Sequence, residues 1–103
     1  MRNMRDDWIA KLQQWAAHNP HVRELWLFGS RAKGEPQPDS DVDIAVLLMP
    51  GTLAALTYTD CFDEWKDALR AIVGTDVSLE PIGPGFPLDS EVRSTGVLLW
   101  SRD

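Results

Sequence analysis

The chain has 103 residues, of which 10 are Lys or Arg and 16 are Asp or Glu, so its formal charge is −6. That length supports one domain, residues 1–103, with one modest core, and 44% hydrophobic residues exclude wholesale disorder. The acidic balance argues against non-specific binding to DNA or RNA, because that binding depends on Lys and Arg. The single cysteine, Cys61, excludes an intramolecular disulfide, and no signal peptide or membrane-spanning run is visible. We therefore expect a small cytoplasmic domain without membrane association.

In chain order, the first half of the sequence predicts a helix followed by two strands. Apolar residues at helical spacing predict a helix over 6–18, which Asn19-Pro20 ends. Alternating side chains predict a strand over 22–28. The polar stretch 30–38 contains glycine and proline, so we expect at most one helical turn there and then a loop. Residues 41–48 are mostly apolar, which is typical of a central strand.

The second half of the sequence predicts two helices and two further strands. Residues 52–73 carry an apolar stripe at helical spacing and precede Gly74, a common type of helix stop. A third strand is expected over 76–82, at a sheet edge because it contains a proline. A short helix over 88–95 and a last strand over 97–100 complete the order. This order predicts an α/β (α+β) domain, in which a small mixed sheet has helices on one face and carboxylates on the other.

The stretch with the clearest chemical character is a Gly-Ser turn followed, ten residues later, by an Asp-x-Asp pair. Residues two apart on a strand share a face, so Asp41 and Asp43 would lie side by side. Adjacent carboxylates repel each other, and Mg²⁺ removes the repulsion because it prefers one or two carboxylates with phosphate oxygens. Gly29 and Ser30 end the preceding strand, where free N–H groups suit a phosphate, and Arg31 adds positive charge. A turn or an acidic loop would explain either half alone, but few structural explanations account for both.

This spacing resembles the signature of the DNA polymerase β-like nucleotidyltransferase superfamily. The sequence of residues 29–34 and 40–44 is most similar to that of the small prokaryotic branch of this superfamily, the minimal nucleotidyltransferases (MNT). The glycine and apolar run at 96–100 also resembles the end of that branch. The resemblance covers most of the chain and implies the polymerase β-like nucleotidyltransferase fold.

The resemblance also implies a role for each residue of the motif. Gly29, Ser30 and Arg31 would bind the triphosphate of a nucleotide, with ATP as the substrate. Asp41 and Asp43 would hold divalent metal, two Mg²⁺ ions in this family. Two such ions would polarise the α-phosphate and stabilise the attacking and leaving oxygens.

A third acidic residue is expected on a neighbouring strand, since the family uses one to bind metal and to deprotonate the acceptor hydroxyl. Asp76 is the best match by order and position, and Glu80, on the same strand face, is the alternative. Family strands usually place two apolar residues after this aspartate, whereas here Val77 is followed by the polar Ser78. A cap or strand-start role for Asp76 is the structural alternative.

The function implied by the resemblance is transfer of a nucleoside monophosphate, AMP from ATP, to a hydroxyl acceptor. A HEPN-family protein is often the partner in the MNT branch, so the resemblance further implies an antitoxin that modifies and silences a HEPN-type toxin. The alternative is a catalytically weak or inactive module that neutralises its partner by forming a complex. A purely structural acidic domain is a third hypothesis, and a homodimer is left open.

The remaining chemistry-bearing residues have simpler interpretations. His18 and His21 flank a turn and are expected at the surface, while Cys61 is expected in a helix against the core. Trp26 and Trp65 fit core positions. Because five tryptophans are many for a domain of this size, we expect one or two of them at a partner surface.

Overall fold

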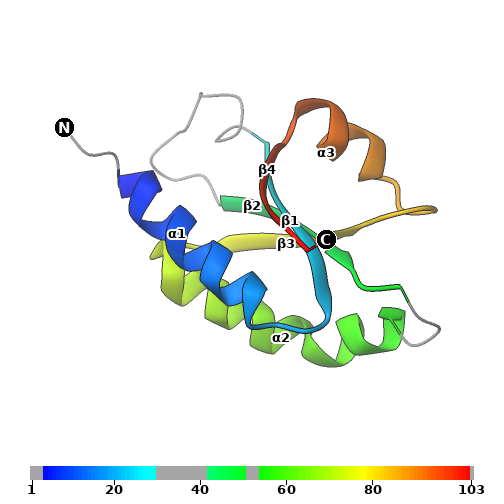
Figure 1. Cartoon of the computed structure of the whole chain (residues 1–103), viewed down its shortest axis with the longest axis horizontal. Helices are drawn as coiled ribbons and strands as arrows, with labels where there is room; N and C mark the ends of the chain where they lie inside the picture. Colours follow the sequence, from blue (N-terminus) through cyan, green and yellow to red (C-terminus); the bar gives the residue numbers. More distant parts are fainter. Residues whose placement is uncertain (1–3, 30–41, 51–53, 103) are drawn as a thin grey trace.

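A four-stranded mixed β-sheet forms the centre of the protein (Figure 1), in the strand order β3-β2-β1-β4. The computed structural model describes residues 4–29, 42–50 and 54–102. β1 (Val22–Phe28) runs antiparallel to both β2 (Val42–Leu48) and β4 (Val97–Ser101). β3 (Val77–Ile82) runs parallel to β2. The predicted central position of the apolar strand and the predicted edge position of the proline-containing strand are both confirmed.

Within the described residues, the sheet is accompanied by the helices α1 (Met4–Ala17), α2 (Ala54–Val73) and α3 (Asp89–Thr95). α1 and α2 lie on one face, and α3 lies on the other side of the sheet (Figure 1). The expectation of helices on a single face therefore holds for α1 and α2 and is wrong for α3. The physical reason is the route of the chain, because α3 connects β3 at one edge of the sheet to β4 at the other.

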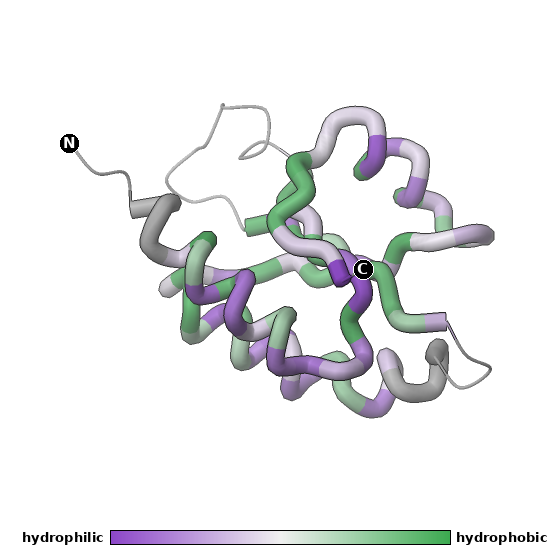
Figure 2. The backbone as a smooth tube through the Cα atoms, in the orientation of Figure 1, coloured by the Kyte–Doolittle hydropathy of each residue, from purple (hydrophilic) through white to green (hydrophobic). Residues whose placement is uncertain are grey.

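The main hydrophobic core lies between the sheet and the layer of α1 and α2. Alternate strand residues such as Leu27, Ile44 and Leu79 point into it, and they meet Leu12 of α1 and Leu69 of α2. Figure 2 shows hydrophilic and hydrophobic residues alternating along both helices, which is the pattern of helices with one buried side. Burial of this apolar surface is the main free energy gain that holds the two layers together.

A smaller cluster fills the opposite face of the sheet. Val92 of α3 is fully buried there against Ala45 and Ile82. The half-buried Trp26 and Phe28 pack against the same cluster. Their side chains alternate with those of Leu25 and Leu27, as predicted for the first strand. In the part of the chain that the structure describes, α3 is the helix that packs on this face.

The five tryptophans contribute to both clusters without any being fully exposed. Trp8 and Trp65 are buried, whereas Trp15, Trp26 and Trp100 are half-buried. The predicted core position of Trp65 is confirmed, and the predicted partner surface stays a prediction. Within the part of the chain that the structure describes, no helix is long and apolar enough to cross a bilayer.

Candidate functional site

The end of β1 and the starts of β2 and β3 lie next to one another at one end of the sheet, which brings separate parts of the sequence together. β1 is antiparallel to β2, so the end of β1 lies beside the start of β2, and Phe28 pairs with Asp43. β3 is parallel to β2, so its start lies at the same edge, where Asp43 aligns with Ser78. The Val42 N–H donates to the Asp76 carbonyl oxygen at 2.9 Å. Gly29, Asp43 and Asp76, which were predicted to act together, therefore lie on elements that converge here.

Gly29 and Asp43, one residue from each half of the predicted motif, lie against each other. The φ of Gly29 is +75°, in the left-handed region that favours glycine. A Cβ at this position would overlap with the Oδ2 atom of Asp43. The turn after β1 can therefore pass over the Asp43 carboxylate only if residue 29 has no side chain. Gly29 and Asp43, the residues to which the resemblance assigns phosphate binding and metal binding, therefore lie against each other.

Asp76 lies directly before β3, and its carboxylate turns toward α2. Its Oδ1 atom is 3.2 Å from Nε of Arg70, in the last turn of that helix. Both side chains are about two-thirds exposed, at 63% and 64%. Glu80, the alternative third carboxylate, aligns with Ala45 and so lies two residues further from the strand ends than Ser78. The register therefore favours Asp76 over Glu80 as the carboxylate nearest the converging strand ends.

The other predicted site residues, Ser30, Arg31 and Asp41, lie outside the described residues, as does the turn and loop predicted for 30–38. Across 4–29, 42–50 and 54–102, no group of three or more His, Cys, Asp or Glu side chains is arranged to hold a metal ion. Among the described residues, the Asp43 carboxylate lies against Gly29, and carboxylate oxygens are ligands that Mg²⁺ prefers. Asp43 and Asp76 are the two predicted metal ligands among these residues, and the chemistry of their carboxylates suits a divalent cation.

A polar recess of about 400 Å³ adjoins Asp76 at the outer edge of the sheet. Its charged lining comes from α2 and includes Asp63, Lys66, Asp67 and Arg70. Arg70 was not singled out from the sequence. The available signal was its position in the last turn of a helix that leads, through a short connection, to Asp76 and β3.

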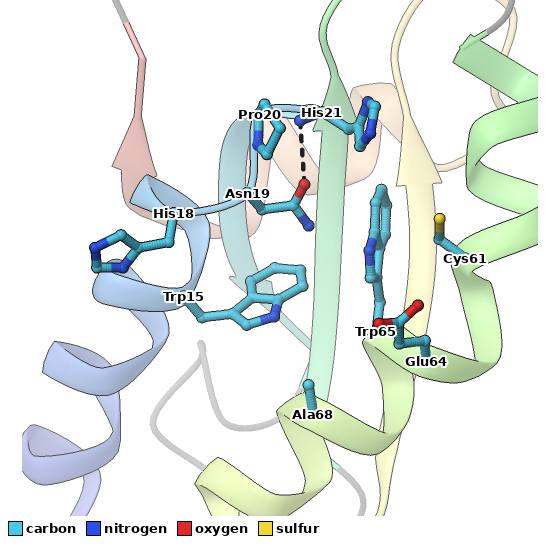
Figure 3. Close-up of a pocket in the computed structure, with 9 residues that line it drawn as sticks. All are labelled: Trp15, His18, Asn19, Pro20, His21, Cys61, Glu64, Trp65 and Ala68. Atoms are coloured by element: carbon cyan, nitrogen blue, oxygen red, sulfur yellow. Dashed lines mark hydrogen bonds between the residues drawn. The ribbon is translucent and has the colours of Figure 1, made fainter.

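A second recess, of about 520 Å³, lies between the α1–β1 turn and α2 (Figure 3). Trp15 and Trp65 meet there edge to face, with ring centroids 5.9 Å apart. His18 and His21 are exposed and Cys61 is half-buried on α2, as predicted. The turn precedes β1, so this recess is at the opposite end of that strand from Gly29. None of the residues that line it belongs to the candidate site at the converging strand ends.

A family model described as "Polymerase beta, Nucleotidyltransferase" matches residues 10–103. The chain belongs to this nucleotidyltransferase family. The predicted polymerase β-like fold, with its mixed sheet, is thereby confirmed. No curated protein matches the chain.

Several solved structures resemble this nucleotidyltransferase over almost its whole length. A chain from a toxin–antitoxin structure with AMP-PNP is 27% identical, with a TM-score of 0.66, and the match covers 99% of this chain and 76% of that chain. A chain from a mutant of the toxin–antitoxin MntA–HpeT is 25% identical, with a TM-score of 0.65 and coverage of 99% and 76%. A third comes from tri-AMPylated Shewanella oneidensis HEPN toxin in complex with MNT antitoxin. At 21% identity, a TM-score of 0.61 and coverage of 97% and 74%, that likeness shows the fold alone.

Proposed function

We propose that this chain is a metal-dependent nucleotidyltransferase that moves AMP from ATP to a hydroxyl group on a HEPN-type toxin and acts as its antitoxin in the cytoplasm. The observation that carries the proposal is the close approach of Gly29 to the Asp43 carboxylate. A glycine with positive φ at a strand end lets the backbone come close to a strand carboxylate, which suits a phosphate that shares a cation with that carboxylate. We take residues 1–103 as one catalytic domain.

In the proposed reaction, Gly29, Ser30 and Arg31 bind the triphosphate, and Asp41, Asp43 and Asp76 supply the carboxylate oxygens for Mg²⁺. Bound Mg²⁺ ions would contribute Lewis-acid polarisation of the α-phosphate and neutralise the leaving pyrophosphate. Asp76 accepts the hydroxyl proton as the acceptor oxygen forms its bond to the α-phosphorus. The bond from that phosphorus to the β-phosphate oxygen breaks, and pyrophosphate leaves.

The choice of nucleotide and partner is supported by the structural neighbours. One of them comes from a toxin–antitoxin structure with AMP-PNP, and another from a complex of an AMPylated HEPN toxin with its MNT antitoxin. The resemblance of residues 29–34 and 40–44 to the MNT branch points to the same partner class. We therefore propose a HEPN-family protein as the acceptor and ATP as the donor.

A second candidate function is neutralisation of the partner by complex formation without catalysis. The observation that favours it is the ion pair of Asp76 with Arg70, because a carboxylate held by an arginine is less available to metal. The third carboxylate is the one that the family uses as base. Both functions require the partner complex, and only the first requires the Asp43 carboxylate.

The test is intact mass spectrometry of the chain co-expressed with a HEPN protein encoded beside it, before and after addition of ATP and Mg²⁺. We expect AMP-sized mass increments on the partner with the wild-type chain and none with Asp43→Asn. Asp60→Asn is the matched control, because Asp60 is an exposed aspartate of α2 and the variant makes the same change of charge away from the converging strand ends.

Each outcome separates the candidate functions. Increments that persist in Asp43→Asn mean that the site is misassigned. A stable complex without increments in any variant supports neutralisation by complex formation alone. Loss of increments in Asp60→Asn as well as in Asp43→Asn means that the effect is one of charge and not of the site.

A further inference from the structure

The ion pair between Arg70 and Asp76 joins the end of α2 to the start of β3. Nε of Arg70 lies 3.2 Å from Oδ1 of Asp76, within the distance of an ion pair. The Asp76 backbone is held independently, because its carbonyl oxygen accepts from the Val42 N–H at 2.9 Å. Rotation of the Asp76 side chain is therefore possible without moving β3, and in the structure the carboxylate is directed toward the Arg70 guanidinium.

The recess around this pair contains other carboxylates that Arg70 can reach. Asp63, Asp67 and Lys66 line it together with Arg70 and Asp76. Asp67 precedes Arg70 by one helical turn, three residues, so the two side chains lie on neighbouring positions of the same helix face. Both are exposed. An arginine that leaves Asp76 would thus find a second carboxylate within the same recess, without any change in the backbone.

We propose that Arg70 is an exchangeable counter-ion for Asp76. It holds the carboxylate in the metal-free protein and releases it to a divalent cation, and its guanidinium then turns to Asp67. This inference rests on the proposed function, since it takes Asp76 as the third carboxylate. Arg70 is a positioning residue here, because it acts on the cation only through Asp76.

The size of the effect follows from the exposure of the pair. At 63% and 64% exposure, water screens the interaction strongly, and exposed ion pairs contribute up to about 1 kcal/mol, which equals roughly a fivefold change in an equilibrium constant. Competition from Arg70 should therefore weaken cation binding by about two- to fivefold. Such an effect adjusts the cation concentration at which the site fills and does not prevent filling.

The experiment is a titration of the full chain with Mn²⁺ alone, followed by the electron paramagnetic resonance signal of free Mn²⁺. We expect Arg70→Gln to bind Mn²⁺ about two- to fivefold more tightly than the wild type. Lys66→Gln is the matched control. It removes one positive charge from the same recess, but the Lys66 ammonium lies over the Phe62 ring, 5.8 Å from its centroid, and not beside Asp76. Its effect should be smaller than that of Arg70→Gln.

The Asp76→Asn background isolates the pair. If Arg70 acts through Asp76, Arg70→Gln has no effect on Mn²⁺ affinity once Asp76 is replaced, as in a double-mutant cycle. Equal tightening in Arg70→Gln and Lys66→Gln, or tightening that survives Asp76→Asn, would overturn the inference and leave only a general charge effect.

The Asp43→Asn variant separates this inference from the proposed function. If Asp43→Asn binds Mn²⁺ as the wild type does, the metal site itself is misassigned and both proposals fail. If Asp43→Asn loses binding while Arg70→Gln matches the wild type, only the role of Arg70 is refuted.

Discussion

Replacement of Gly29 by alanine tests the contact on which the proposed function rests. An L-residue in the left-handed region costs about 1–2 kcal/mol, and Gly29 has φ +75°. The added Cβ would also overlap with Oδ2 of Asp43, so the carboxylate must leave its position. A side chain forced about 30° off its rotamer costs a further ~0.5–1.5 kcal/mol. The expected loss of unfolding free energy is therefore about 1.5–3.5 kcal/mol.

Gly74 provides a matched control within the same chain. Its φ is +79°, almost the same as that of Gly29, but nothing lies within 4 Å of a Cβ built on it. Gly74→Ala should therefore lose only the backbone contribution, about 1–2 kcal/mol. The difference between the two variants isolates the contact with the Asp43 carboxylate. In an Asp43→Ala background that difference should vanish, because the carboxylate is absent.

The assay is equilibrium urea unfolding of the single and double variants, together with binding of AMP-PNP in the presence of Mn²⁺. We expect Gly29→Ala to lose nucleotide binding, since its displaced carboxylate no longer faces the turn, and Gly74→Ala to retain it. The reasoning is refuted if the two variants are equally stable and bind the nucleotide equally. It is also refuted if the excess cost at Gly29 persists in the Asp43→Ala background.

Two further predictions concern the framework around the site. A Cβ at Gly96 would lie 2.5 Å and 3.0 Å from carbonyl oxygens of α3 and β1, so Gly96→Ala should cost about 1–3 kcal/mol by urea unfolding. Ser94→Ala, on the exposed side of α3, should change stability by less than about 0.5 kcal/mol, and similar losses in both variants would contradict the steric explanation. The Tyr58 hydroxyl donates to the Leu79 carbonyl oxygen at 3.2 Å, and burial, followed by the nearby Glu80 charge, raises the pKa of Tyr58 above its ordinary value of 10.0. The neutral hydroxyl contributes its full stability below the ordinary pKa, and that contribution is lost as the pH rises toward the folded pKa. The wild type should therefore be about 1 kcal/mol more stable than Tyr58→Phe near neutral pH, and this difference should shrink above pH ~10. A difference in stability that stays constant with pH would contradict this prediction.

Most elements of the fold follow from local patterns along the chain. The first strand begins at Val22 and ends at Phe28, as its alternation of side chains predicted. The long helix ends at Val73 before Gly74, as the apolar stripe and glycine predicted. These signals are local, because helix and strand periodicities and glycine stops depend on residues a few positions apart. They do not specify which face of the sheet a helix covers, and the position of α3 was accordingly missed.

The candidate site divides in the same way. Gly29 and Asp43 were identified from their spacing and from resemblance to a family, and the structure shows that the two residues lie against each other. The partner of Asp76 was not identified. Arg70 and Asp76 are six positions apart across a helix end and a turn, and no periodicity relates such positions.

The sequence by itself thus determines the helices, the strands and the central place of the apolar strand, and it identifies the candidate residues of the Gly-Ser and Asp-x-Asp motif. Only the tertiary structure shows that the Asp43 carboxylate lies against Gly29, that α3 covers the face opposite α1 and α2, and that Arg70 pairs with Asp76. The reason is physical. Backbone dihedral preferences and hydrophobic periodicity act over one or two turns, whereas the direction of an exposed carboxylate depends on whichever charge the packing of α2 against β3 brings near it.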